Sequence, residues 1–229
     1  MATVERAKKI VYPESDGQPL AETQQHVNAL LDVYSRLRAR YAVAADGYTA
    51  ANMFVYYVEG EPTKVLAPDA FVAFGVGNHL RDTFKVWEEG VFPSVVFEFT
   101  SKTTKNDDLG KKFATYRDVW KVKEYFLFDP LKEYLEPSLL GYKRVRREFE
   151  QIPKVNGTLA SKVLGLTMER DGEMLLLRDA KSSKPLLLPG ELKAEDAERM
   201  LAKQRAENDQ LLAEVAKLKA EVAALRKGN

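Results

Sequence analysis

The sequence predicts an α/β (α+β) domain over residues 1–190, followed by a long helix over residues 191–229. Two observations predict the domain: amphipathic stretches with apolar residues spaced three and four apart, and short runs rich in aromatic and β-branched residues. A third predicts the terminal helix. After Pro189 and Gly190 the chain has no further proline or aromatic residue, and its next glycine is Gly228.

Two helices and several strands are predicted along the domain. The first amphipathic helix is predicted from about Leu20 to Tyr41, with an apolar stripe of Val27, Leu30, Leu31, Tyr34, Leu37 and Tyr41. The second covers Asp108–Trp120, with one apolar face of Leu109, Phe113, Tyr116 and Trp120. Strands are predicted at Met53–Val58, Ala70–Phe74, Val95–Thr100 and Glu124–Phe128, with shorter ones between Gly141 and Arg178.

The composition excludes several classes of protein. With 45% hydrophobic residues among 229, the chain is too apolar to be disordered. Its 35 lysines and arginines against 34 acids argue against coating nucleic acid by bulk charge, although a local basic patch remains open. The absence of cysteine excludes disulfide scaffolds, zinc ribbons, iron–sulfur clusters and thiol catalysis. Two histidines are too few for a His-rich metal site, which leaves a carboxylate site for a hard cation.

Neither a membrane nor an organic cofactor is expected. No stretch of about 18 apolar residues occurs, and the N-terminus lacks an apolar leader segment, so we expect a cytoplasmic protein. The chain has no P-loop and no Gly-x-Gly-x-x-Gly fingerprint. It also lacks a Gly-x-Ser-x-Gly elbow, which disfavours Ser-His-Asp chemistry.

A seven-residue repeat predicts that residues 191–229 form a coiled coil. Valine at the a positions and leucine at the d positions favour a parallel two-stranded coil, and one asparagine at a fixes its register. The positions expected to mediate self-association are Leu201, Asn208, Leu211, Val215, Leu218, Val222 and Leu225. The alternative is a solitary solvated amphipathic helix, because only about four heptads are present.

Two acids in or beside predicted strands are candidate metal ligands. Asp69 follows Pro68 at the start of one strand, and alternation places Glu98 between apolar neighbours late in another. Burying such an acid is costly unless a metal ion or a cationic side chain offsets its charge. Mg²⁺ prefers one or two carboxylates together with water and phosphate oxygens. Alternatively, Asp69 only forms a turn, and Glu98 is a structural partner of a lysine.

A lysine on the second predicted helix is the candidate cation. Lys112 lies about 60° from the apolar stripe, whereas Lys111 lies nearly opposite it. Lys112 therefore leans toward the sheet, where it could stabilise charge on a phosphate or orient an attacking water. The alternative is that Lys112 runs along the helix edge with its ammonium in water. Other lysines of this segment, Lys102, Lys105 and Lys111, are candidates for contact with nucleic acid.

These residues resemble a known family. Pro68-Asp69, the segment from Val96 to Thr104, then Asp108, Lys112 and Tyr116, and finally the segment from Glu124 to Pro130 occur in the order seen in the Uma family of restriction-endonuclease-like proteins. That family belongs to the PD-(D/E)XK nuclease superfamily, and the likeness covers roughly residues 10–180.

The resemblance implies a mixed central sheet flanked by helices and Mg²⁺-dependent (or Mn²⁺-dependent) hydrolysis of DNA. It implies that Asp69 and Glu98 bind the metal and that Lys112 is the catalytic lysine. The superfamily pattern has a lysine two residues after the glutamate, where this chain has Thr100. The resemblance also implies that Glu22, on the first helix, is an additional catalytic acid, with His26 one turn later.

Three functions are therefore weighed. The leading hypothesis is an endonuclease that dimerises through its C-terminal coil. The second is an inactive nuclease-fold module that binds DNA or a protein partner, which Thr100 and the near-neutral charge favour. An assembly protein driven by the coil is the third, and it leaves Glu98 and Lys112 unexplained.

Overall fold

The computed structural model describes residues 10–15, 17, 22–42 and 47–188, together with isolated residues between 190 and 202. The chain divides into two compact units, Met1–Leu186 and Leu187–Asn229. The positions of the predicted coiled coil, Leu201, Asn208, Leu211, Val215, Leu218, Val222 and Leu225, lie outside the described residues. Within the described part of the chain, no helix has the length and apolar character needed to cross a membrane.

The first unit is built around a six-stranded sheet, with the strand order β1-β4-β6-β7-β8-β9. Its strands are β1 (Gly47–Ala51), β4 (Ala70–Phe74), β6 (Val95–Phe99), β7 (Glu124–Phe128), β8 (Leu139–Val145) and β9 (Glu148–Gln151). β6 and β7 run parallel, and the other neighbouring pairs are antiparallel. The predicted mixed central sheet is confirmed.

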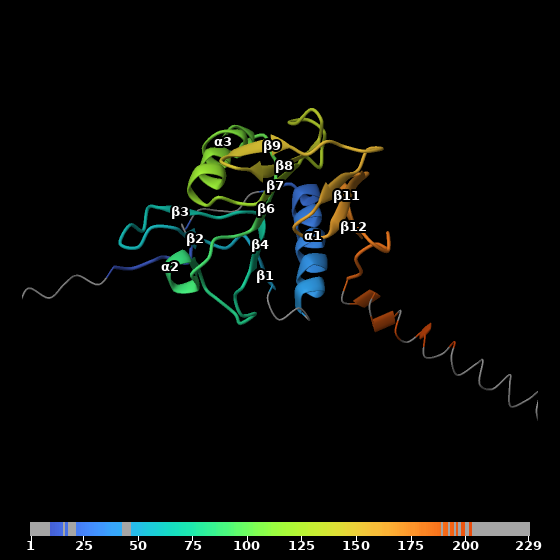
Figure 1. The fold of residues 1–229 in the computed structure, drawn as a ribbon, viewed down its shortest axis with the longest axis horizontal. Helices are drawn as coiled ribbons and strands as arrows, with labels where there is room; N and C mark the ends of the chain where they lie inside the picture. The colour runs from blue at the N-terminus through green and yellow to red at the C-terminus, as the bar shows by residue number, and fades with distance from the viewer. Residues whose placement is uncertain are drawn as a thin grey trace, which may run out of the picture. The chain divides into compact units, whose positions relative to one another are not determined.

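One face of this sheet packs against helix α1 (Gln24–Ala42) and a small antiparallel sheet. The small sheet consists of β10 (Leu159–Ser161), β11 (Leu166–Asp171) and β12 (Met174–Asp179). Figure 1 shows α1 between the central sheet and β11–β12. Alternation along β6 points Val95, Phe97 and Phe99 into this core.

The buried face of α1 differs from the predicted apolar stripe. Its buried side chains are His26, Ala29, Leu30, Val33, Leu37 and Tyr41. Val27 is 39% exposed and Leu31 is 50% exposed, so the stripe is rotated by about one residue. The predicted stripe contained only large apolar residues, so it left out Ala29 and His26, which are buried.

The other face is covered by short helical segments and a three-stranded sheet. These are α2 (Val86–Glu89), α3 (Lys105–Leu109), α4 (Lys111–Ala114), the π-helix η1 (Thr115–Val119), and β3 (Val65–Leu66), β2 (Val55–Tyr56) and β5 (Phe84–Lys85). Tyr116 and Trp120 are buried in this core beside Val96, Tyr125 and Leu127 of the central sheet. The two cores therefore lie on opposite faces of one sheet, as alternation along β6 and β7 requires.

The predicted helix Asp108–Trp120 is interrupted in the structure. It begins earlier, at Lys105, and breaks at Gly110, whose backbone angles are φ −115° and ψ −97°. The break turns the first segment relative to the second, so Leu109 is 40% exposed and Asp108 is fully buried. A single 100° periodicity cannot describe both segments, which is why the predicted apolar face fails at Leu109.

Most strands were predicted more accurately, although the predicted strand Met53–Val58 is only the two-residue β2. Ala70–Phe74 and Glu124–Phe128 have the predicted bounds, and β6 ends one residue before Thr100. β1 was not predicted, because its sequence Gly-Tyr-Thr-Ala-Ala contains few β-branched residues. Gly47 is required there, since a Cβ would lie 2.8 Å from Cδ1 of Tyr41.

A buried carboxylate ties the small sheet to the central one. Glu124, at the start of β7, is 3% exposed. It accepts hydrogen bonds from the Ser161 hydroxyl and from the N–H groups of Lys162 (2.9 Å) and Val163 (3.3 Å). Burial raises the pKa of Glu124, and these donors oppose that shift.

Candidate functional site

The two acids predicted as metal ligands lie side by side at one end of the central sheet. Asp69 directly precedes β4, and Glu98 is the fourth residue of β6. The antiparallel register pairs Ala70 with Phe97, which places Asp69 opposite Glu98. The Asp69 N–H donates to Glu98 Oε2 (3.4 Å), and the Phe99 N–H donates to Asp69 Oδ2 (2.6 Å). The backbone of two neighbouring strands thus fixes both carboxylates.

Lys112 reaches the same place from α4. Its Nζ donates to Glu98 Oε2 at 2.9 Å and to Asp108 Oδ1 at 2.9 Å. The structure therefore brings Asp69, Glu98 and Lys112 together. It also adds a third acid, Asp108, which is fully buried. Among the described residues, Asp108 Oδ2 has no hydrogen-bond partner.

Two buried tyrosines support these acids. The Tyr116 hydroxyl donates to Glu98 Oε1 at 2.6 Å, and the Tyr125 hydroxyl donates to the Asp108 carbonyl at 2.9 Å. In the sequence, Tyr116 lies on the predicted apolar face, and its hydroxyl has no predicted role. A usable signal was its spacing of four residues from Lys112, which aligns both on one helical face.

Burial dominates the electrostatics of the cluster. It raises the pKa of Glu98 to about 8 and that of Asp69 to about 6, and Lys112 opposes both shifts. Burial by itself lowers the pKa of Lys112, but Glu98, Asp108 and Asp69 outweigh it and raise that pKa above its usual value. Three acids thus share one lysine, and Lys112 does not fully offset the cost of ionising Glu98 and Asp69 in this buried position.

His26 joins Glu22 to the cluster. Its Nδ1 lies 3.5 Å from Glu22 Oε2, and its Nε2 lies 4.0 Å from Asp69 Oδ2. Burial lowers the pKa of His26, which favours the neutral ring, and Glu22 opposes this shift. Glu22 stands two residues before α1 rather than on it, and it faces His26. In sequence His26 was only a flank of the apolar stripe.

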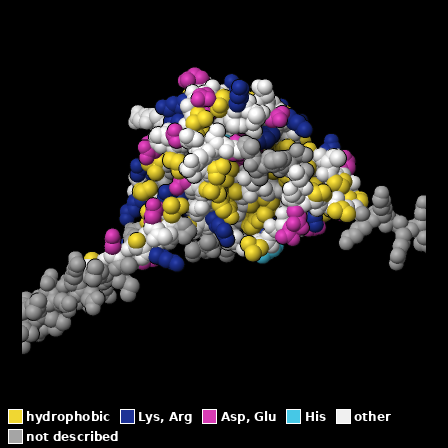
Figure 2. Space-filling view, turned by 180° about the vertical axis from the view of Figure 1, so that it is seen from behind, with side chains coloured by type: hydrophobic (Ala, Val, Ile, Leu, Met, Phe, Trp, Pro, Cys, Tyr) yellow, Lys and Arg dark blue, Asp and Glu magenta, His cyan; other side chains and the backbone are white. Residues whose placement is uncertain are grey.

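The three lysines predicted to contact nucleic acid are exposed. Lys105 lies in α3 and Lys111 in α4, while Lys102 lies in the loop after β6. The contacts of the cluster involve Lys112 and not these side chains. The face in Figure 2 carries lysine and arginine interspersed with acids, which agrees with the near-neutral net charge.

The donors of the cluster suit a hard cation. Among the described residues, no group of three or more histidine, aspartate or glutamate side chains is arranged to hold a metal ion as it stands. Mg²⁺ needs fewer protein ligands, because it commonly binds one or two carboxylates and completes its coordination shell with water and phosphate oxygens. The Asp69–Glu98 pair provides that number of oxygen ligands, and the nearby Asp108 Oδ2 has no hydrogen-bond partner among the described residues.

Comparison with known proteins gives one family. A crystal structure described as "a putative nuclease belonging to DUF820 from Anabaena variabilis" is similar, with 12% sequence identity and a TM-score of 0.47. The match covers 66% of this chain and 81% of that one. No curated protein matches. The model of the Uma2 family, described as "Putative restriction endonuclease", matches residues 2–169. Because this match spans most of the 229 residues, the chain belongs to the Uma2 family.

Proposed function

We propose that the chain is a divalent-metal-dependent nuclease that hydrolyses phosphodiester bonds in DNA. The observation that carries the proposal is the convergence of Asp69 and Glu98, from neighbouring strands, on the ammonium of Lys112. Two carboxylates and a cation at the end of a sheet are the groups that metal-assisted phosphodiester hydrolysis requires. Membership of the Uma2 family supports this reading.

Asp69 and Glu98 would hold Mg²⁺ or Mn²⁺. The raised pKa values of both groups, about 6 and about 8, reflect buried acids that lack enough positive charge around them. A bound divalent cation supplies that charge, lowers the pKa of a water molecule and neutralises phosphate oxygens.

The remaining groups hold the acids and supply fixed charge. The Phe99 N–H orients Asp69, and the Tyr116 hydroxyl orients Glu98. Lys112 stays protonated because of its three acidic neighbours, so it can stabilise negative charge that develops on a phosphate. Asp108 positions Lys112 through the bond between Oδ1 and Nζ.

Cleavage of a supercoiled plasmid with Mg²⁺ or Mn²⁺ tests the proposal. Glu98→Gln and Asp69→Asn are each expected to slow nicking at least about 100-fold, because a lost metal ligand removes several kcal/mol of transition-state stabilisation. Glu150→Gln is the control, since Glu150 is an exposed glutamate of β9, outside the cluster. Cleavage that survives both site substitutions, or that fails equally in the control, would contradict the proposal.

We also propose that residues 191–229 dimerise the protein, so that two catalytic units act on one DNA. Deletion of these residues is expected to give a monomer by light scattering. A truncated chain that remains dimeric would show that the contact lies elsewhere.

One observation favours an inactive module that only binds DNA or a partner. Both oxygens of Glu98 already accept hydrogen bonds, Oε1 from Tyr116 and Oε2 from Lys112, and Thr100 stands at the superfamily's lysine position. In that case Lys112 serves as the permanent cation of the cluster. Calorimetric titration with Mn²⁺ separates the two functions. An active site binds the ion and loses it in Asp69→Asn, whereas an inactive module shows no binding that depends on Asp69.

A further inference from the structure

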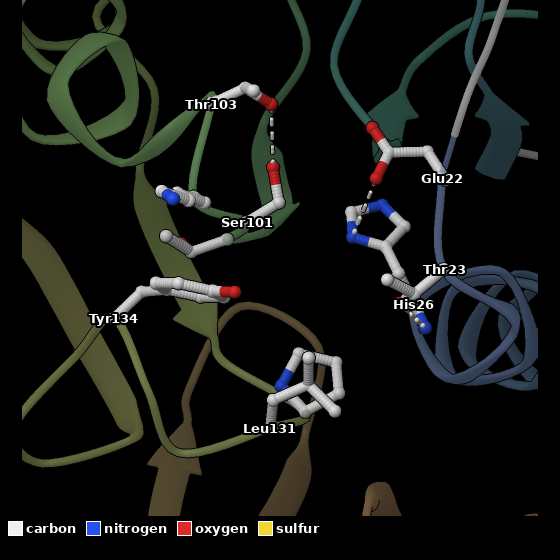
Figure 3. A pocket seen from close by; sticks show the side chains of 10 residues that line it. Glu22, Thr23, His26, Ser101, Thr103, Leu131 and Tyr134 are labelled. Carbon is white, nitrogen blue, oxygen red and sulfur yellow. Dashed lines mark hydrogen bonds and ion pairs between the residues drawn. The ribbon is translucent and has the colours of Figure 1, made fainter.

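A pocket of about 160 Å³ adjoins the carboxylate cluster. Figure 3 shows Glu22 and His26 on one side, with Ser101 and Tyr134 on the other and Leu131 below. His26 is the link to the cluster, since its Nε2 lies 4.0 Å from Asp69 Oδ2. A ligand in this pocket would therefore lie one side chain, that of His26, away from Asp69.

The wall that carries Tyr134 is rigidly held. Asp129, fully buried, accepts hydrogen bonds from the N–H groups of Leu131 (3.0 Å), Tyr134 (2.5 Å) and Leu135 (2.9 Å). Arg170 donates to the carbonyl oxygens of Asp129 and Pro130 from the small sheet. These anchors hold the backbone from which the tyrosine ring projects, so little ordering of the loop is needed for binding.

The wall that follows β6 is polar. The Ser101 hydroxyl bonds to those of Thr103 (3.0 Å) and Thr104 (3.2 Å), and Lys102 lines the pocket between them. Thr100 also lines it and is only 1% exposed. Its hydroxyl finds no hydrogen-bond partner within the described part of the chain. A buried hydroxyl without a partner is costly, so a ligand that reaches it would gain stability.

The two walls together fit a nucleotide better than a bare anion. Pro130, Leu131 and Tyr134 offer an aromatic ring and apolar surface, which a phosphate alone would not use. Lys102 provides positive charge for a phosphate, and stacking on an aromatic ring suits the flat face of any base. Glu22 can accept a hydrogen bond from an N–H group on the edge of a base.

We propose that this pocket binds one unpaired nucleotide next to the scissile phosphate, with its base against Tyr134 and its phosphate near Lys102. The inference rests on the proposed nuclease function and names its substrate class. A base inside a duplex is stacked and paired, so it enters such a pocket only after leaving the helix. The preferred substrates are therefore single strands, frayed ends and mismatched sites.

Fluorescence anisotropy with short probes tests the pocket without cleavage. The probes are a fluorescein-labelled thymidine tetranucleotide and an abasic backbone with the same number of phosphates, both in EDTA. The wild-type protein is expected to bind the thymidine probe roughly tenfold more tightly, which corresponds to one stacked base. Tyr134→Ala is expected to bind both probes equally, and Tyr134→Phe to behave as the wild type. Tyr34→Ala, a half-buried tyrosine of α1 outside the pocket, is the matched control.

The outcomes separate the pocket from the catalytic proposal. Equal binding of the two probes by the wild type, no binding of either, or an unchanged preference in Tyr134→Ala would overturn the pocket. A longer single strand is expected to displace the thymidine probe at lower phosphate concentration than its blunt duplex, and the reverse order would overturn the requirement for an unpaired base. A protein that shows the base preference and cuts neither plasmid nor a long single strand with Mg²⁺ would refute the nuclease function alone.

Discussion

Replacing Tyr116 by phenylalanine measures the charge of Glu98 directly. The Tyr116 hydroxyl is fully buried and donates to Glu98 Oε1 at 2.6 Å, and burial raises the pKa of Glu98 to about 8. A hydrogen bond to a neutral acceptor contributes about 1 kcal/mol, and one to a charged acceptor about 2 kcal/mol. Glu98 is protonated at pH 6 and ionised at pH 9.5, so Tyr116→Phe is expected to cost about 1 kcal/mol more at the higher pH.

The direction follows from linkage. The folded protein holds the proton of Glu98 more tightly than the unfolded chain, so Glu98 contributes stability below pH 4.5 that is lost as the pH rises through about 8. The hydrogen bond from Tyr116 favours the ionised form of Glu98, so it reduces that loss of stability. Without it, stability declines more steeply between pH 6 and pH 9.5.

Urea unfolding in EDTA at both pH values provides the assay, with the substitution made in the wild type and in Glu98→Gln. In the Glu98→Gln background, where no charge can form, the cost of Tyr116→Phe is expected to stay near 1 kcal/mol at both pH values. The reasoning is wrong if the cost in the wild type is the same at pH 6 and pH 9.5, or if it is larger at pH 6.

Three further substitutions test the fold. Gly110→Ala is expected to cost about 1–3 kcal/mol in urea unfolding, because the new Cβ would lie 2.7 Å from the carbonyl oxygen of Asn106; unchanged stability would contradict the described break. Phe97→Ala, at a core position that is 1% exposed, is expected to cost about 3–5 kcal/mol by the same measurement. Hydrogen bonds to its carboxylate lower the pKa of Asp179 to about 2, and the bond from the Ser182 N–H has the largest effect. The melting temperature of Asp179→Ala should therefore lie below that of the wild type at pH 7, and the gap should close as the pH falls from 4 toward 2.

The central strands and the acid pair could be predicted because they depend on local patterns. Runs of aromatic and β-branched residues mark β4 and β7, and alternation along β6 identifies Glu98 as a buried acid. Asp69 stands at the start of its strand, so antiparallel pairing of the two strands is enough to bring both acids together. Lys112 could be placed from helical geometry, because α4 and η1 continue in one direction past it.

The other residues of the cluster depend on features that the periodicity of the sequence does not reveal. Gly110 reorients the segment before it, and this turns Asp108 inward in place of Leu109. His26 occupies a buried row of α1, whereas the apolar residues Val27 and Leu31 of the predicted stripe are exposed. The position of a buried polar residue depends on its partners from other elements. For His26 the partner is an acid before β4, which the sequence of α1 alone cannot identify.

The hydrogen bonds to Glu124 make the stability of the central sheet depend on the small sheet. If β10–β12 detached, the carboxylate at the start of β7 would lose the three donors of residues 161–163 while remaining inside the apolar interior. Detachment of the small sheet therefore costs free energy both at the Glu124 carboxylate and at its donors. The first unit is expected to unfold in a single step, without earlier unfolding of the β11–β12 hairpin. The same reasoning sets the shortest useful fragment, which must extend to the end of β12 at Asp179 to keep the small sheet and the donors of Glu124 in place.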